Sequence, residues 1–540
     1  MYGSTRPLAA RGTGRAGRAR ALAVAVAVAL GLALLGTSAP ALAQGDEPDI
    51  LKVAHTANIT TWDPVKSFST EALYMANMYE PLLWVNPPGS EDPFTPALAT
   101  DWSASEDGLT WTFHLREGVT FHDGEPLTAE AVVKSIEAAR ERSGASFIWW
   151  PVESVEAVDD LTVAIHVSTP AAVDLIASSL YGAWIVSPKA LDAAAADDTW
   201  FEVGVSAGTG PYMLESWVPD GEVLLTQNED YWGGWDDMDH YEKVLVTIMS
   251  EAVDQQQALD GDQVDLAFNL PSENLDQYEA DPDFTVLREP SLFDYVGFFN
   301  TQRPPLDDPL VRQALAYATP YADIIEVATA GLGTQARGPV PAGVFPYSDD
   351  TPQYTTDMDK ARELMAQAGV DGFDMEITYA AENQYEAAFA PLLQEAYGEL
   401  GVDVTLTPMP FNQQWERGKG DPEGRQDMFL LLYWPTYSDA GSDNLYSMFH
   451  SSEAPFFNLS YWVDEEYDTL IDEAGTLTGV DRDAAQATYE EAMVRLVDQS
   501  PGIFFYDTIF PAAIPSDIAG YQYNLNYPFA QSFYPLHPAE

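Results

Sequence analysis

The chain contains no cysteine among its 540 residues. This absence excludes disulfide bonds, thiol catalysis and cysteine-ligated metal centres. It also removes the residue that carries the lipid of bacterial lipoproteins. We therefore expect the chain to have no lipid anchor.

Basic residues are scarce, with 24 Lys and Arg against 85 Asp and Glu and a formal net charge of −61 at pH 7. A field of this sign opposes binding to nucleic acid and to anionic membrane surfaces. Because the acids are spread along the whole chain, we favour a salt-adapted surface over a device that steers cationic ligands.

Long hydrophobic runs are absent after residue 43. The apolar run Ala21 to Leu35 falls short of the ~20 residues that a membrane-spanning helix needs. It follows a segment with five arginines and no acid, and Ala41-Leu42-Ala43 comes after it as a cleavage signal. The sequence therefore predicts a signal peptide over residues 1–43, a mature chain without an integral membrane segment, and a periplasmic, secreted or cell-surface protein.

Motifs for catalysis or metal binding are also few. There is no H-E-x-x-H motif and no phosphate-binding loop, and the dinucleotide pattern G-x-G-x-x-G occurs only at residues 12–17, inside the predicted signal peptide. The segment 204–208 matches the G-x-S-x-G pattern of a hydrolase, but that elbow needs a helix after it, and Thr209-Gly210-Pro211-Tyr212 indicates a hairpin instead. We expect no catalytic residue, no cofactor and no enzymatic activity, with a secreted hydrolase as the alternative.

The seven histidines are dispersed without the spacing of metal ligands, so we expect no metal site. They are His55, His114, His122, His166, His240, His450 and His537. His114 lies on a strand predicted by the alternation of Leu109 to Leu115, and His122 lies on the next short extended piece. We interpret both as structural residues of a hairpin.

Hydrophobic residues make up 46% and aromatic residues 12% of the chain, enough for the cores of two to four domains. Period-two patterns and apolar runs predict strands over residues 50–55, 109–115, 152–158, 161–167, 212–217, 222–227, 376–379, 402–407, 428–433 and 504–507. Helical spacing predicts helices over residues 70–78, 128–140, 311–318, 322–330, 359–368, 385–400, 465–474 and 482–499. Strands and helices are mixed throughout, without a repeat of fixed period.

Several segments together resemble one family, the extracytoplasmic solute-binding proteins of family 5, which serve peptide and nickel ABC importers. They are A-L-A-T-D-W at 97–102, D-G-L-T-W-T-F-H-L-R-E-G-V-T-F-H-D-G at 107–124, G-T-G-P-Y at 208–212, N-E-D-Y-W-G-G at 228–234, L-D-G-D-Q-V-D at 259–265, V-R-Q-A-L-A-Y-A at 311–318, G-L-G-T at 331–334, G-P-V-P at 338–341 and A-R-E-L-M-A-Q-A-G at 361–369. They occur in order over nearly the whole predicted mature chain.

The resemblance implies an α/β type II periplasmic-binding-protein fold, in which two lobes joined by a hinge close around a solute. An extra domain is inserted in the first lobe. We expect lobe I at residues 45–85, 206–301 and 512–540, the extra domain II at 86–205, and lobe II, also called domain III, at 302–511. The chain crossings near Asn300 and Tyr506 are expected to form the hinge.

The resemblance also places candidate ligand-binding residues directly after the predicted buried strand 428–433, because open α/β sheets present ligands at the carboxyl ends of strands. These residues are Trp434, Thr436, Tyr437, Ser438 and Asp439. Peptide-binding members typically read W-x-A-D-Y here, and the aspartate holds the free amine of the ligand. In this chain, counting forward from Trp434 places Tyr437 at the position of that aspartate. Counting back from Asp443-Asn444-Leu445 places Ser438 near it. Asp439 is the acidic residue closest to this position in the sequence.

Aromatic side chains offer further candidate platforms, which are Trp62, Trp149, Trp150 and Phe457. We expect the protein to be the extracytoplasmic receptor of an ABC importer, a monomer that captures an oligopeptide or a similarly sized solute for a permease and ATPase complex. An oligosaccharide held on aromatic platforms is the alternative ligand, and nickel or a metallophore is a further one.

Overall fold

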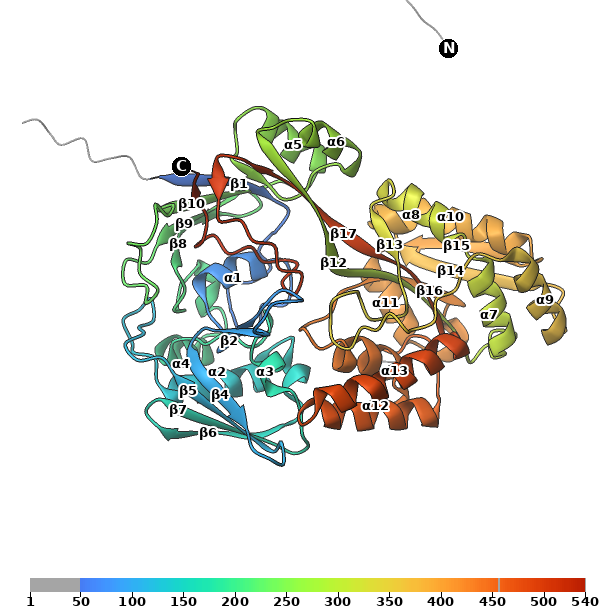
Figure 1. Ribbon diagram of the computed structural model, residues 1–540, viewed down its shortest axis with the longest axis horizontal. Helices are drawn as coiled ribbons and strands as arrows, with labels where there is room; N and C mark the ends of the chain where they lie inside the picture. The colour runs from blue at the N-terminus through green and yellow to red at the C-terminus, as the bar shows by residue number, and fades with distance from the viewer. Residues whose placement is uncertain (1–48, 455–456, 540) are drawn as a thin grey trace, which may run out of the picture. The chain divides into compact units, whose positions relative to one another are not determined.

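The computed structural model describes residues 49–454 and 457–539, shown as a ribbon in Figure 1. The predicted signal peptide, residues 1–43, lies outside the described residues. Within the described ranges, no helix has both the length and the apolar character needed to cross a bilayer.

A five-stranded sheet has the order β11-β1-β10-β9-β8. Its strands are β1 (Ile50–His55), β8 (Tyr212–Val218), β9 (Glu222–Gln227), β10 (Lys243–Ile248) and β11 (Leu266–Ala267). Residues on the two faces of β1 belong to different hydrophobic cores. Leu51 and Val53 share a core with helix α1 (Ala72–Met78). Ala54 shares another with α5 (Ala252–Asp260) and α6 (Leu275–Glu279). All of these strands fall within the range predicted for lobe I.

A four-stranded antiparallel sheet has the order β4-β5-β7-β6. Its strands are β4 (Ala99–Ala104), β5 (Thr110–Leu115), β6 (Val152–Asp159) and β7 (Thr162–Val167), and helix α2 (Ala129–Arg142) packs against it. Trp111, Phe113 and Leu115 are buried along β5, which confirms the predicted alternation. His114 lies on the other face, 2.7 Å from Asp101, so the polar pair stabilises the sheet surface.

A six-stranded mixed sheet has the order β13-β17-β12-β16-β14-β15. Its strands are β12 (Phe284–Phe299), β13 (Gly333–Gln335), β14 (Asp374–Ala380), β15 (Asp403–Met409), β16 (Met428–Tyr433) and β17 (Gly502–Pro515). Strand β16 lies between β12 and β14, and its first four residues are buried on both faces, as predicted for this apolar run.

Helices cover both faces of this sheet. Met428 and Leu430 pack with α7 (Pro309–Ala318), α8 (Tyr321–Thr329), α9 (Met358–Ala368) and α10 (Gln384–Gly398). Phe429 and Leu431 pack with α12 (Glu465–Thr478) and α13 (Arg482–Gln499). The remaining elements are β2 (Leu83–Val85), β3 (Phe94–Pro96), α3 (Val173–Ile176), α4 (Pro188–Ala196), α11 (Phe411–Lys419), β18 (Ile518–Ala519) and β19 (His537–Pro538), with short helical turns at Ser146–Trp149, Trp200–Val203, Ser272–Asn274, Pro422–Gly424, Gly441–Ser447 and Ser451–Glu453.

The long strands β12 and β17 run antiparallel beside each other (Figure 1). Their first paired stretch joins residues 284–290 to 509–515 and lies beside α6, and their second joins 294–298 to 502–507. The register shifts between Pro290 and Asp294. Tyr506, expected near the hinge, pairs with Tyr295 next to this shift, whereas Asn300 lies beyond the end of β12 and donates its N–H to the Asp427 carbonyl oxygen.

Candidate functional site

A cavity of about 610 Å³ lies between two parts of the chain that are distant in sequence. One wall comes from residues 147–151 and 169–176 of the range predicted for domain II. The other comes from residues 437–453, from Phe457 and from helices α12 and α13. Its volume is that of a small-molecule or small-peptide site, for which about 300 to 1,000 Å³ is typical.

The loop after β16 is fixed to its own strand by Asp443. One carboxylate oxygen accepts the Tyr433 hydroxyl at 2.6 Å, and the other accepts the backbone N–H of Thr436. Burial raises the pKa of Asp443 to about 6, although these hydrogen bonds oppose the shift. The bonds hold the predicted binding loop in one conformation at the carboxyl end of the strand.

Tyr437 and Asp439 are the residues of this loop that line the cavity. Tyr437 is only 7% exposed. The Asp439 carboxylate accepts the Ser442 backbone N–H at 3.2 Å and its hydroxyl at 2.9 Å, and burial raises the pKa of this carboxyl above its usual range. Asp439 is therefore oriented by neutral donors.

The other predicted loop residues lie in a narrow crevice of about 10 Å³, which has room for roughly one water molecule. Trp434, Thr436 and Ser438 line it, together with residues 178–181 and 526–529. The Ser179 hydroxyl donates a hydrogen bond of 3.1 Å to the Thr436 carbonyl oxygen. The loop is thus packed directly against parts of the predicted domain II and lobe I.

The predicted aromatic platforms divide into two groups. Trp150, 66% exposed, and Phe457 line the cavity. Trp149 is 2% exposed, with its indole N–H donated to the Gly182 carbonyl oxygen at 2.8 Å. Trp62 is 1% exposed, with its ring 5.6 Å from that of Trp217. Trp149 and Trp62 therefore lie in the core and do not line this cavity.

Several cavity residues are absent from the sequence-based set. They are Phe147, Ser442, Asp443, Tyr446, Glu453, Asp472, Thr476 and Tyr489, among others. Asp472 and Thr476 are four residues apart on α12 and so share a face, a signal that the sequence contains. Nothing in the sequence says that this face meets residues 147–176.

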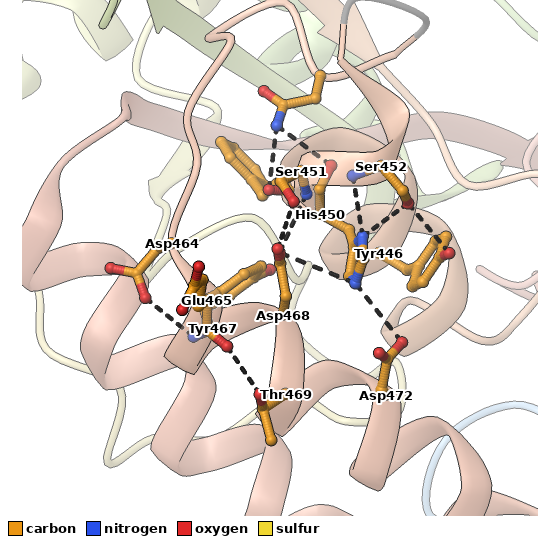
Figure 2. A network of polar contacts seen from close by, with 12 residues as sticks. Tyr446, His450, Ser451, Ser452, Asp464, Glu465, Tyr467, Asp468, Thr469 and Asp472 are labelled. Atoms are coloured by element: carbon orange, nitrogen blue, oxygen red, sulfur yellow. Dashed lines mark hydrogen bonds and ion pairs between the residues drawn. The ribbon is translucent and has the colours of Figure 1, made fainter.

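A polar network borders the cavity where α12 meets the segment 446–452 (Figure 2). The Nδ1 atom of His450 accepts the Ser452 backbone N–H at 3.1 Å, and its Nε2 atom lies 3.8 Å from Asp468 and 3.5 Å from Asp472. The imidazole stacks on Tyr446, with 4.4 Å between ring centroids. This stacking fixes Tyr446, which lines the cavity together with Asp472.

The possible catalytic and metal motifs have structural explanations. Ser206 of the G-x-S-x-G segment accepts the Leu214 backbone N–H at 2.7 Å, and the chain continues into β8 without a helix. His122 lies 2.9 Å from the Gly210 carbonyl oxygen. Within residues 49–454 and 457–539, no group of three or more His, Cys, Asp or Glu side chains is arranged to hold a metal ion.

Known proteins resemble the chain in sequence over most of its length. The "Probable D,D-dipeptide-binding periplasmic protein" of Escherichia coli K12 is 26% identical over 497 residues, covering 91% of this chain and 95% of that protein. The heme-binding protein A of Haemophilus influenzae is 28% identical, covering 80% of this chain and 82% of that protein. Neither name identifies the solute of the present chain.

Solved structures show the same fold. The structure of HbpA2 from Haemophilus parasuis has a TM-score of 0.78 at 25% identity, covering 91% of this chain and 100% of that one. A periplasmic binding protein of Helicobacter pylori in complex with the peptide STSA has a TM-score of 0.74 at 24% identity, covering 91% and 98%. The chain thus has the two-lobe α/β fold of periplasmic binding proteins. The family model of bacterial extracellular solute-binding proteins, family 5 (middle region), matches residues 93–456, and the chain belongs to this family of solute-binding proteins.

Proposed function

We propose that the protein captures an oligopeptide or a similarly sized organic solute outside the cytoplasmic membrane and delivers it unchanged to the permease and ATPases of an ABC importer. The cavity of about 610 Å³ carries this proposal, because two distant parts of the chain enclose it and its walls combine aromatic faces with a few oriented polar groups. No covalent step is needed for this role.

A peptide is supported as the ligand class by the relatives. They include a dipeptide-binding protein of Escherichia coli K12, 26% identical over 457 residues. Asp439 and Tyr437 both line the cavity, so the same loop offers a carboxylate and an aromatic ring to a ligand.

Capture would proceed by closure of the predicted lobes. The shift between Pro290 and Asp294 interrupts the pairing of the two long strands, and such points absorb the dihedral changes of a hinge. Contacts from domain II to lobe II complete the closed state, and the ion pair of Arg482 with Asp174 at 2.6 Å is one of them. A solute that binds the closed state better shifts the population toward it.

The same proposal includes the domain ranges expected from the sequence, with lobe I at 45–85, 206–301 and 512–540, domain II at 86–205 and lobe II at 302–511. We further propose that the signal peptide is cleaved after residue 43. The mature protein would then be a monomer outside the cytoplasmic membrane, without a lipid anchor. Mass spectrometry of the exported protein would test the cleavage site and the lipid together.

An oligosaccharide is the second candidate ligand. Trp150 and Phe457 line the cavity with aromatic side chains, and apolar sugar faces stack on such platforms. Neutral hydroxyl groups could be held by Asp439 and Ser442.

Native mass spectrometry of the purified protein, exposed separately to a tryptic digest of casein and to a mixture of malto- and cello-oligosaccharides, distinguishes the two ligand classes. We expect peptides to be retained and released with unchanged mass. Tyr437→Ala and Asp439→Ala should weaken retention. Full retention by both variants would contradict the assignment of the binding loop, and retention of sugars only would favour the second candidate.

A further inference from the structure

The charged side chains described in the lining of the cavity are all acidic. Four acidic side chains line it, whereas the described lining residues include no lysine, arginine or histidine. The acids are Asp439, Asp443, Glu453 and Asp472. Acids make up about the same share of this lining as of the whole chain, but these four line one cavity that is also lined by aromatic rings.

Neutral donors, rather than protein cations, hold two of these carboxylates. Ser442 donates to Asp439, while Tyr433 and Thr436 donate to Asp443. Hydrogen bonds of this kind orient a carboxylate but leave its negative charge in place. A cationic group in the cavity would therefore meet carboxylates that form no ion pair with a described lysine or arginine, although the nearby charge of Arg482 partly offsets the rise that burial causes in the pKa of Asp439.

The other two carboxylates, those of Glu453 and Asp472, make fewer polar contacts with the described residues. Among the described residues, none donates a hydrogen bond to the Glu453 side chain, which burial has partly removed from water. Asp472 lies 3.5 Å from the His450 Nε2 atom, which it shares with Asp468 (Figure 2). Both side chains can accept a ligand donor without breaking a strong internal bond.

Nearby cations are occupied outside the cavity. Arg482 pairs with Asp174 at 2.6 Å. Lys419 lies 4.6 Å from the centroid of the Trp415 ring and 6.0 Å from that of Phe457, and it is not a lining residue. A solute carboxylate in the cavity would therefore face like charges without a partner, which is costly away from bulk water.

The aromatic rings suit a cation as well. Trp150 and Tyr446 line the cavity, and ammonium or guanidinium groups are attracted to the faces of such rings. Tyr446 is held by its stacking on His450. Acids and rings together match a solute with a positive charge beside an apolar part.

We propose that the part of the solute that fills this cavity is cationic and carries no free carboxylate, as in a basic peptide amide or an aromatic amine. This inference rests on the proposed function, because it concerns the same cavity and names the charge class of its ligand. The protein should therefore reject any ligand of its relatives that would place a carboxylate in this cavity.

Isothermal titration calorimetry of the purified mature protein with two forms of one basic peptide and with an anionic analogue tests the inference. The probes are lysyl-phenylalanyl-lysine amide, the same peptide as a free acid, and acetyl-glutamyl-phenylalanyl-glutamate. We expect the amide to bind about 10-fold more tightly than the free acid and about 100-fold more tightly than the anionic peptide, and the preference should persist at about 0.5 M salt, where exposed charges are screened.

Matched variants separate the cavity from the acidic surface. Glu453→Gln and Asp472→Asn should each weaken binding of the amide by about 5- to 10-fold. Glu229→Gln, at an exposed position outside the cavity, should leave it unchanged. Equal effects of all three variants, or loss of the preference at high salt, would show nonspecific attraction and overturn the inference.

The outcomes also separate this inference from the proposed function. Binding of the free acid or of the anionic peptide at least as tightly as the amide would overturn the charge assignment and leave peptide capture standing. Absence of binding for all three probes and for the casein digest would overturn both.

Discussion

Asp294 of β12 and Asp507 of β17 are paired directly across neighbouring strands, and both are buried. Both oxygens of Asp294 and one of Asp507 have no hydrogen-bond partner among the described residues. Burial raises the pKa of Asp507 to about 7, and burial followed by the charge of Asp507 raises the pKa of Asp294 well above its usual range. The pair lies next to the interruption in strand pairing and is favoured in its neutral form.

This pair predicts a pH dependence of stability. When the pKa of a carboxyl is higher in the folded than in the unfolded chain, its neutral form stabilises the folded state. This contribution to the free energy of unfolding is fully present below the unfolded pKa of about 4, and it is lost as the pH rises through the folded pKa of about 7. We expect the melting temperature to fall between pH 5 and pH 8, measured by differential scanning calorimetry. Asp507→Asn should reduce this fall by the equivalent of about 1 to 4 kcal/mol.

The matched control is Asp359→Asn, whose side chain is 99% exposed. It should leave the pH profile unchanged. An Asp507→Asn variant with the same profile as the unmodified protein would mean that the pair is ionised in the folded state at no cost.

Substitutions of the adjacent residues Trp149 and Trp150 should have different effects, one on stability and the other on solute binding. Trp150→Ala should weaken solute binding by about 10-fold with little change in melting temperature, because this ring lines the cavity and is largely exposed. Trp149→Ala should lower the free energy of unfolding by about 3 to 5 kcal/mol, because it empties a core position and leaves the Gly182 carbonyl without its donor.

Calorimetric titration and chemical denaturation of the two variants check this pair. The account would fail if the losses were reversed, with Trp150→Ala the unstable variant. Trp149→Phe, which keeps an aromatic ring in the core, serves as the conservative comparison and should recover part of the lost stability.

The ion pair between Arg482 and Asp174 should stabilise the closed form of the protein. Asp174 is buried, so Arg482→Gln leaves a desolvated carboxylate without its cation, a change that costs about 3 to 5 kcal/mol in such sites. We expect this variant to open more readily and to bind solute more weakly. The double variant Asp174→Asn/Arg482→Gln should recover much of the affinity.

Stopped-flow fluorescence of solute binding measures this effect, and Arg362→Gln is the control because the ion pairs of Arg362 are exposed. An additive effect of the two single changes in the double variant would show that the pair does not stabilise the closed state.

The sequence predicted the elements where one local pattern dominates. Met428 to Tyr433 is a fully apolar run, and it forms β16 with the predicted bounds. The helix predicted over residues 482–499 also has those bounds. The long strand β12 was not predicted. It contains Pro290, and proline is uncommon within a central strand. The fold tolerates Pro290 because the pairing shifts register beside it.

The site was predictable only in part, for a geometric reason. Tyr437 and Asp439 follow a buried strand, so their place at its carboxyl end could be inferred from the chain order. Trp149 and Trp150 sit at the end of one short helical turn, and a turn of this length gives no periodic signal to say which ring faces the core. Asp472 reaches the cavity through tertiary packing, which the local sequence does not encode.

Small-angle X-ray scattering with and without a peptide that binds, chosen from the casein digest by native mass spectrometry, tests the central claim most directly. The account predicts that the radius of gyration falls when the peptide is added, as the population shifts toward a closed form in which Arg482 meets Asp174. A radius that stays the same while the peptide is shown to bind would contradict capture by closure.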